Sequence, residues 1–424
     1  MTCAYSVPNC TSDVAADAQR CRCGGFLKRC PRCDTRNRGF ANFCRACGSV
    51  LPPSAQNWTA YKGSARRLGV SGSARGPASL AENVTLRLRL GDECRSLLAC
   101  DGVLVAISLA GVVEIADPRR AASLCRFQVQ GPITAEPCIR NGMLYLGTRG
   151  QLTAYALAPM TATTPRVQPV WQMPIVGTPI HALTAAGNRL FVTVASSGWR
   201  DIQVIDSIHR PQPAPARTLF GAANAGWLAA DAAGRAVFFS EDVQGVQLHV
   251  FDRELTTHPV SLRSLVEQPI ALLGDTIFGI FGEEHRLYRI DAATGSIAEP
   301  LDADTQLFAL THAGEDEWDR DGARIDTRGI SFLRSGIHDG FGPHEWATRG
   351  SPLIVQGCAV VIGMDDGRVR VYDLAHLPRH EAWLVGGNGG VAITALASFE
   401  TFLAAGNKEG IVEVRELRTP GAKQ

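Results

Sequence analysis

One short pattern recurs along most of this chain: apolar residues alternate with polar ones, and most copies end in Asp. Its clearest copy is Val369–Leu374, which reads VRVYDL. Alternation with a period of two is typical of a β-strand with one buried face, and recurrence at a regular spacing is typical of a stacked repeat. The other copies begin at Val113, Leu152, Ile202, Leu248, Leu287 and Val412.

The intervals between these copies favour one all-β architecture. Most copies lie about 40 to 50 residues apart, and tight-turn pairs such as Asn141-Gly142 and Asp366-Gly367 separate the short strands. Helical periodicity is nearly absent. A series of short strands repeated at this length predicts a β-propeller in which each unit is one four-stranded blade.

The spacing also predicts the number of blades. The interval from Leu287 to Val369 is 82 residues, twice the usual length, so a further blade is expected within residues 305–350, with Ile330–Leu333 as its alternating strand. That makes eight blades; seven blades with an insertion is the alternative. The last unit lacks a fourth strand, which residues 84–90 (VTLRLRL) are expected to supply by pairing with the C-terminal blade.

Cysteines are concentrated at the N-terminus, where eight of the thirteen fall within the first 47 residues. Cys30 and Cys33, then Cys44 and Cys47, form two short knuckles that can supply four thiolates to one Zn²⁺. A segment this short has too little core to fold without a metal. Disulfides are the competing interpretation, and zinc is preferred because no secretion signal precedes the segment.

The preceding half repeats this plan less regularly, and a second zinc is expected there. Its ligands would be Cys3, Cys10, Cys21 and Cys23; the alternative is a degenerate ribbon whose thiols are merely reduced. Residues 1–51 as a whole resemble the bacterial double zinc-ribbon family, with Cys30–Cys47 as the specific part. No His occurs before His181, so these zinc sites are expected to be structural rather than catalytic.

The predicted organisation is therefore a double zinc ribbon (residues 1–51), a flexible linker rich in small residues (52–83) and the propeller (84–424). Residues 1–83 carry twelve basic and four acidic side chains, a charge of +8 that bound thiolates would reduce to about +4. This surface can contact protein or nucleic acid. Protein is the preferred partner, and nucleic acid is the alternative, based on Arg32, Arg36, Arg38 and Arg45.

One repeat unit adds a second resemblance. Leu287–Gly295 is similar to the quinoprotein-like repeat, in which an alternating strand runs into Asp-x-x-Thr-Gly. The quinone-binding members place two adjacent cysteines at the cofactor, and this chain has none, so a cofactor-free scaffold is implied. Propellers with zinc ribbons also resemble components of bacterial multi-gene systems that contain a MoxR-type ATPase and a von Willebrand A-type protein, which are the implied partners.

No catalytic residue is assigned from the sequence. The acidic stretch 315–321, followed by His338, His344 and Glu345, is the one region suited to an enzyme or metal site, and a solvated contact loop is the simpler interpretation. The chain has neither a basic segment leading into an apolar run nor about 18 uninterrupted apolar residues. The expectation is a cytoplasmic, non-enzymatic interaction scaffold that does not bind membranes.

Overall fold

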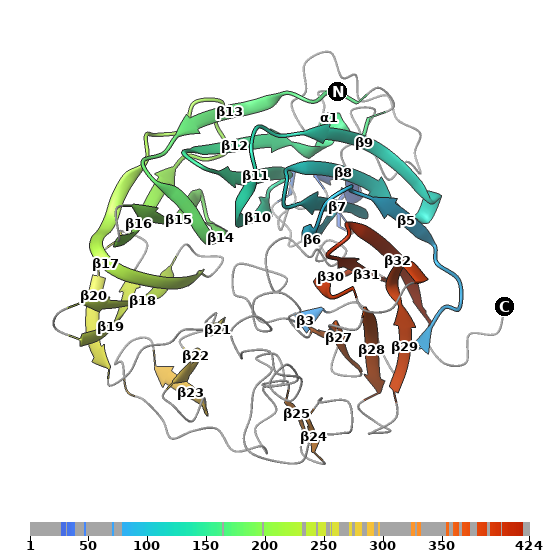
Figure 1. Cartoon of the computed structure of the whole chain (residues 1–424). Helices are drawn as coiled ribbons and strands as arrows, with labels where there is room; N and C mark the ends of the chain where they lie inside the picture. Colours follow the sequence, from blue (N-terminus) through green and yellow to red (C-terminus); the bar gives the residue numbers. More distant parts are fainter. Residues whose placement is uncertain are drawn as a thin grey trace.

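A computed structural model of the chain shows small antiparallel sheets arranged around a ring (Figure 1). No helix among the described residues is long and apolar enough to cross a membrane. The structure describes residues 27–30, 32–38, 46–47, 70–71, 79–162, 165–196, 199–230, 235–242, 245–251, 255, 257–262, 271–273, 276–281, 286–291, 296, 324–326, 329–331, 353–355, 359–363, 367–373, 380–387, 391–399 and 401–418.

The first two blades are complete four-stranded sheets in which each strand pairs with the next. A 3-10 turn, η2 (Pro118–Arg120), and a short helix, α1 (Leu157–Met160), link the third strand of each blade to the fourth. The first blade contains β6 (Cys94–Cys100), β7 (Val103–Ser108), β8 (Val112–Asp117) and β9 (Ala122–Gln128). The second contains β10 (Ile133–Arg140), β11 (Met143–Thr148), β12 (Gln151–Ala156) and β13 (Pro169–Pro174).

The third and fourth blades share one long strand. The first part of β17 (Arg217–Ala230) pairs with β16, and its last part pairs with β18. The same strand is therefore the outer strand of one blade and the inner strand of the next. The other strands of these blades are β14 (Thr178–Ala186), β15 (Arg189–Ser196), β16 (Trp199–Asp206), β18 (Ala236–Asp242), β19 (Gly245–Phe251) and β20 (Thr257–Leu262).

The remaining described strands continue the ring. They are β21 (Ala271–Leu273), β22 (Thr276–Phe281), β23 (Arg286–Asp291), β24 (Arg324–Asp326), β25 (Gly329–Ser331), β26 (Leu353–Val355), β27 (Ala359–Gly363), β28 (Arg368–Asp373), β29 (His380–Leu384), β30 (Ile393–Phe399), β31 (Phe402–Asn407) and β32 (Ile411–Arg418). A 3-10 turn, η4 (Val385–Gly387), follows β29. The predicted all-β propeller is confirmed.

The alternating pattern marks the same place in each of these sheets. Its seven copies form β8, β12, β16, β19, β23, β28 and β32, each of which is the third strand of its unit. The expected copy at Ile330–Leu333 overlaps β25, which pairs with β24 in a two-stranded sheet. Residues 297–323 and 332–352 lie outside the described part, so the count of eight blades stays a prediction.

The ring closes with a strand from before the first blade. β5 (Leu86–Arg89) pairs antiparallel with β32, with Leu86 opposite Val414 and Arg89 opposite Ile411. Two short strands, β3 (Val70–Ser71) and β4 (Ser79–Leu80), lie within the range expected to be a flexible linker, and they pair with β26 and β32. At these positions the linker runs along the sheets, whereas the domain boundaries themselves stay predictions.

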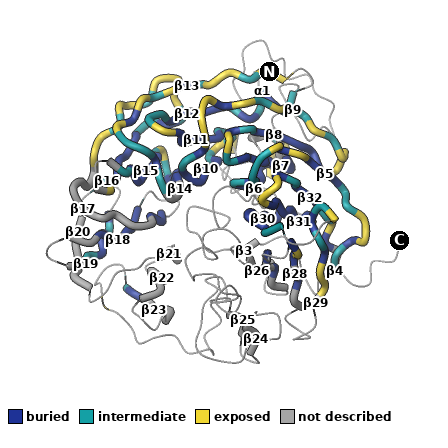
Figure 2. The backbone as a smooth tube through the Cα atoms, in the orientation of Figure 1, coloured by how far each residue is buried: buried dark blue, intermediate teal, exposed yellow. Residues whose placement is uncertain are grey.

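The core lies between neighbouring blades as well as within them. One apolar cluster joins β5 and the last blade to β6 and β7 of the first, and another joins the second blade to the third. Figure 2 shows the buried backbone concentrated in the inner strands of the described blades. Because each sheet buries apolar side chains against its neighbours, the closing strand stabilises the ring directly.

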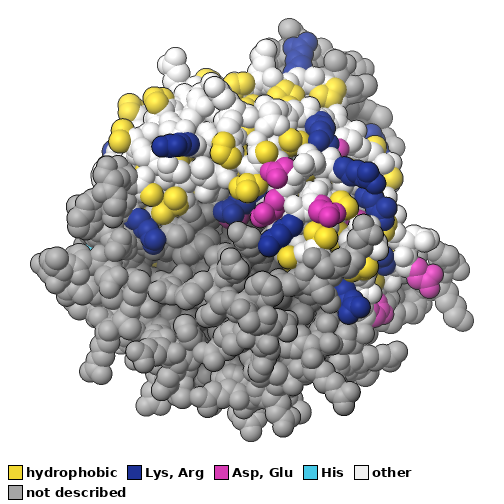
Figure 3. Space-filling model, viewed as in Figure 1, with side chains coloured by type: hydrophobic (Ala, Val, Ile, Leu, Met, Phe, Trp, Pro, Cys, Tyr) yellow, Lys and Arg dark blue, Asp and Glu magenta, His cyan; other side chains and the backbone are white. Residues whose placement is uncertain are grey.

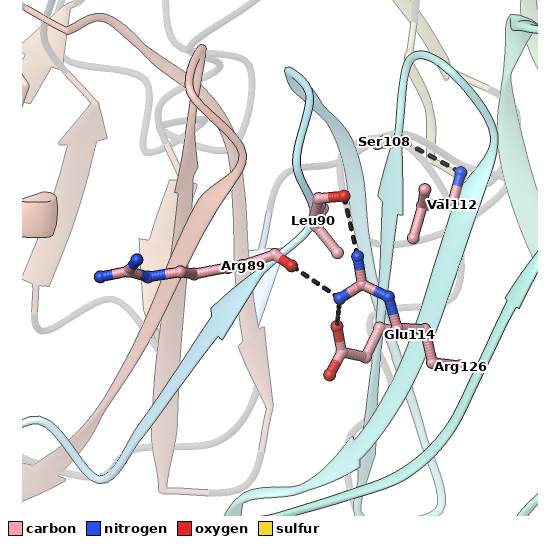
Figure 4. A network of polar contacts seen from close by, with 6 residues as sticks. All are labelled: Arg89, Leu90, Ser108, Val112, Glu114 and Arg126. Carbon is pink, nitrogen blue, oxygen red and sulfur yellow. Dashed lines mark hydrogen bonds and ion pairs between the residues drawn. The ribbon is translucent and has the colours of Figure 1, made fainter.

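A guanidinium group fastens the closing strand to the first blade (Figure 4). Arg126 of β9 donates from Nη1 to the buried Glu114 carboxylate of β8 at 2.8 Å and to the carbonyl of Arg89 at 2.6 Å. Its Nη2 donates to the carbonyl of Leu90 at 3.0 Å. One side chain thus neutralises a buried carboxylate and satisfies backbone acceptors at the end of β5. The ion pair in the first blade therefore also helps to hold the closing strand in place.

Candidate metal centre and interaction surfaces

The cysteine region contains a short hairpin whose turn brings thiols together. β1 (Leu27–Arg29) pairs antiparallel with β2 (Arg36–Arg38). In the turn between them, the Asp34 amide donates to the carbonyl of Cys30 at 2.9 Å, and the Cys30 amide donates to the carbonyl of Thr35 at 3.0 Å. Asp34 has a φ of +54°, a left-handed conformation that Asp tolerates better than most residues. This turn folds Cys33 back toward Cys30.

Three thiols converge at this turn. The Sγ atoms of Cys30, Cys33 and Cys47 all lie within 4.8 Å of one another, and those of Cys30 and Cys47 are 3.6 Å apart. Two thiolates on one tetrahedral zinc, each at about 2.3 Å from the metal, are separated by about 3.8 Å. A disulfide requires about 2.05 Å between the sulfurs. The spacing therefore fits ligands of a shared metal ion.

The described thiols include three of the four ligands predicted for the later ribbon. Cys30 is buried, whereas Cys33 and Cys47 are exposed, and the Cys33 thiol donates to the Thr35 hydroxyl at 3.2 Å. A cluster of three cysteines can bind a metal ion. Cys44 and the four ligands predicted for the first ribbon, Cys3, Cys10, Cys21 and Cys23, lie outside the described residues, so the second site stays a prediction.

The described propeller cysteines have a different environment. Cys94, Cys100, Cys125 and Cys138 are all buried within blades. Burial, followed by the negative charges of Glu136 and Glu93, raises the pKa of the Cys94 thiol, and burial also raises the pKa of Cys125. Since the thiolate is the reactive form, these side chains act as small apolar residues rather than nucleophiles.

An open groove runs along the rim between the second and third blades, with a volume of about 730 Å³. One wall is the end of β13 and the connection after it, including Trp171 and Val176; the other includes Gln203 of β16 and the proline-rich connection from Pro211 to Ala216. Val176 is 78% exposed, the one large hydrophobic side chain so exposed among the described residues. An exposed apolar residue beside an apolar groove marks an interaction surface.

The propeller surface seen in Figure 3 mixes charges over its described part. Basic, acidic and hydrophobic side chains are interspersed around the ring rather than gathered into a basic field. Several arginines are neutralised by carboxylates, as in the pairs Arg87 with Glu413 and Arg95 with Glu136, at 2.6 and 2.9 Å. Electrostatic attraction of a polyanion is strongest at a continuous basic patch, which the described part of this face does not show.

The groups considered for catalysis, which are the acidic stretch 315–321, His338, His344 and Glu345, lie outside the described residues, so the enzyme alternative is untested. Sequence patterns did not predict the groove, because its walls come from two different blades. The proline-rich run Pro211–Ala216 (PQPAPA) was the one local signal for it. His209, which received no role from the sequence, lies just before that run and contacts the second blade.

Solved structures resemble this chain at the level of the fold. BamB from Moraxella catarrhalis is 16% identical over 80% of this chain and 100% of its own, with a TM-score of 0.53. The WD40 β-propeller domain of Doa1 is 11% identical over 78% of this chain and 96% of its own, with a TM-score of 0.46. The computationally designed Ika8 protein is 13% identical over 78% of this chain and 99% of its own, with a TM-score of 0.41.

Comparison at the sequence level gives no relative. No protein-family model matches the chain, and no curated protein matches it. The likeness to BamB is below the identity at which function transfers, so it shows the propeller fold alone. Any statement about function must therefore come from the surfaces of this molecule.

Proposed function

We propose that this protein is a non-enzymatic, cytoplasmic interaction scaffold whose propeller and cysteine hairpin dock different protein partners. The observation that carries the proposal is the rim groove between the second and third blades, about 730 Å³ in volume, with Val176 exposed beside it. Propellers are rigid rings, and binding is commonly carried by the connections and rims of such scaffolds.

The groove suits an extended segment of a partner protein. β13, which forms one wall, is the outermost strand of its blade in the described sheet, so one side of its backbone is not paired to another strand of that sheet. An added strand can bond to such an edge while its side chains enter the neighbouring apolar groove. The partner segment is therefore expected to be extended and to place apolar side chains against Trp171 and Val176.

The cysteine hairpin supplies the second docking element. Cys30, Cys33 and Cys47, with Cys44 as the fourth ligand, would hold one Zn²⁺ that fixes the hairpin, and Cys3, Cys10, Cys21 and Cys23 would hold another. A partner held on the ring and another held on the hairpin would meet at a raised effective concentration. A MoxR-type ATPase and a von Willebrand A-type protein are the partners suggested by the resemblance.

The test is recovery of tagged full-length protein from its host, followed by quantification of the accompanying proteins. Val176→Asp should reduce recovery of at least one defined protein tenfold or more, while Gln130→Asp, in the corresponding exposed connection after β9, should leave it unchanged. Replacing Cys30 and Cys33 by Ser should remove a different protein. If V176D and the double Cys variant recover the same proteins as wild type, the scaffold proposal fails.

Nucleic acid is the second candidate partner, and the pairing register of the β1–β2 hairpin, which places two arginines opposite each other, favours it. Arg29 and Arg36 are directly opposite in the β1–β2 pair, and Arg38 occupies a neighbouring register position opposite Leu27. Like charges at opposite positions destabilise a strand pair unless an anion screens them, and phosphates do so. Binding to a labelled single-stranded oligonucleotide should weaken steeply with salt and should be lost in R29E/R36E; binding that ignores salt would exclude this candidate.

A further inference from the structure

One half-buried arginine in the second blade differs from the paired arginines around it. Arg140 is the last residue of β10, and its Nε is buried without a hydrogen-bond partner. Among the described residues, the structure shows no carboxylate within ion-pair distance of it. By contrast, Arg126 and Arg189 each bond to a carboxylate, at 2.8 and 2.7 Å. A guanidinium N–H removed from water without an acceptor costs free energy, so the unsatisfied Nε of Arg140 favours an anionic partner.

Two further polar side chains accompany this guanidinium. Asn141, the next residue, is exposed at the turn into β11, and its Nδ2 lies 3.2 Å from Nε2 of His209. Burial, followed by the positive charge of Arg140, lowers the pKa of the His209 imidazole, against a smaller raising effect of a hydrogen bond to the Gly187 backbone. The three side chains therefore form one electrostatic unit.

The turn that carries His209 is held firmly against the second blade. The carbonyl of Ile208 accepts a hydrogen bond from Trp171 Nε1 at 3.0 Å and from the Tyr145 hydroxyl at 3.4 Å. Tyr145 and Trp171 also contact each other, with ring centroids 5.9 Å apart. A rigid support of this kind preorganises polar groups for a ligand, because little side-chain freedom is lost on binding.

We propose that Arg140, Asn141 and His209 form a binding site for the oxyanion group of a ligand, a carboxylate or a phosphate. Arg140 supplies the charge and a planar set of donors, which matches both groups. Asn141 supplies an amide donor from the exposed side, and His209 adds a donor when protonated. Since β10 runs parallel to β14 and Arg140 ends it, Arg140 lies at the other end of the strands from Val176.

The site predicts a pH dependence. Among the described residues, the groups that act on His209 are Arg140 and the Gly187 backbone, with Asn141 in contact with its imidazole. An anion beside the imidazole would favour its protonated form, so oxyanion binding should take up a proton and strengthen as the pH falls. Sulfate is a suitable probe, since its own charge stays constant over this range.

The experiment is calorimetric titration of the full-length protein with sodium phosphate, glutarate and sulfate at constant ionic strength. Arg140→Met should weaken binding at least tenfold, whereas Arg166→Met, an exposed arginine at the same end of the blade, should have no effect. Sulfate affinity should rise severalfold from about pH 7.5 to pH 5.5 in wild type and should stay flat in His209→Gln. Preference for phosphate or for glutarate identifies the natural chemistry, and either supports the site.

A second variant keeps the test decisive if R140M does not fold. Asn141 has a φ of +51°, which Asp also tolerates, so Asn141→Asp places a carboxylate beside Arg140 with little strain. N141D should raise the thermal midpoint by satisfying the guanidinium and should abolish sulfate binding. Absence of binding of all three anions to wild type, or unchanged binding in R140M or N141D, would overturn the proposal.

Discussion

The pairing of β5 with β32 that closes the propeller, here called the seam, and the cysteine hairpin β1–β2 are both short antiparallel strand pairs. They differ in the interactions that surround them. In the seam, β5 buries Leu86 and Leu88 against the last blade, and burial of one such side chain contributes about 1.5 to 3 kcal/mol. In the hairpin, β1 and β2 have three residues each, and the adjoining turn brings three thiols together. The seam is stabilised by its apolar neighbours, whereas three thiols that can bind a metal ion meet beside the hairpin.

Removing metal should produce the largest difference in stability between the hairpin and the propeller. Structural zinc contributes about 10 to 16 kcal/mol of apparent binding free energy to small domains. A chelator should therefore abolish hydrogen-exchange protection of residues 27–38 while leaving β6–β9 protected. Cys30→Ser should mimic the chelator, and Cys125→Ser, at a buried propeller thiol, should not change the metal content. Protection of the hairpin that survives metal removal would show that it has a core of its own.

The next largest effect should come from crowding the seam. A Cβ atom at Gly406 would overlap Sγ of Cys94 and lie 2.7 Å from its Cβ, between the last blade and the first. Gly406→Ala should lower the free energy of unfolding by about 3 kcal/mol, measured by urea titration, without releasing metal. Adding Cys94→Ala removes the overlapping sulfur, so the double variant should recover at least about 1 kcal/mol. Strict additivity of the two changes would contradict this contact.

A polar change at the seam should have a smaller effect. Arg126→Met leaves the Glu114 carboxylate buried and the carbonyls of Arg89 and Leu90 without this donor, at an expected cost of about 2 kcal/mol. Arg120→Met removes an arginine that is 73% exposed and should change stability by less than about 0.5 kcal/mol. R126M/E114Q should be more stable than R126M. Equal costs for R126M and R120M would mean that the seam is fastened by its apolar contacts alone.

The smallest effect should be the pH response of the ring. Burial and Arg140 lower the pKa of His209 in the folded protein, so this residue favours folding above its unfolded pKa of about 6.5, and that contribution is lost as the pH falls toward the lowered value. The thermal midpoint of wild type should fall slightly more than that of His209→Gln between about pH 7 and pH 5. The hairpin should respond more steeply, because protons compete with metal for thiolates. If the thermal midpoints of wild type and His209→Gln change in parallel with pH, His209 does not contribute to the pH dependence of stability.

The repeating part of the fold could be predicted from local patterns in the chain. The period-two pattern identified the third strand of seven repeat units, because side-chain alternation is a local property of a half-buried strand. The missing fourth strand of the last unit pointed to residues 84–90, where β5 lies. Spacing likewise grouped Cys30, Cys33 and Cys47, since a knuckle is built from residues close in sequence.

Features formed where two blades meet could not be predicted from local patterns and became visible in the folded ring. The sharing of β17 between blades, the groove between Trp171 and the run after Pro211, and the contact of Asn141 with His209 each join segments that no local pattern links. The unsatisfied Nε of Arg140 is likewise invisible in the sequence, since the lack of a carboxylate nearby among the described residues depends on which blades pack around it. Local periodicity specifies elements, whereas sites arise where the ring brings distant elements into contact.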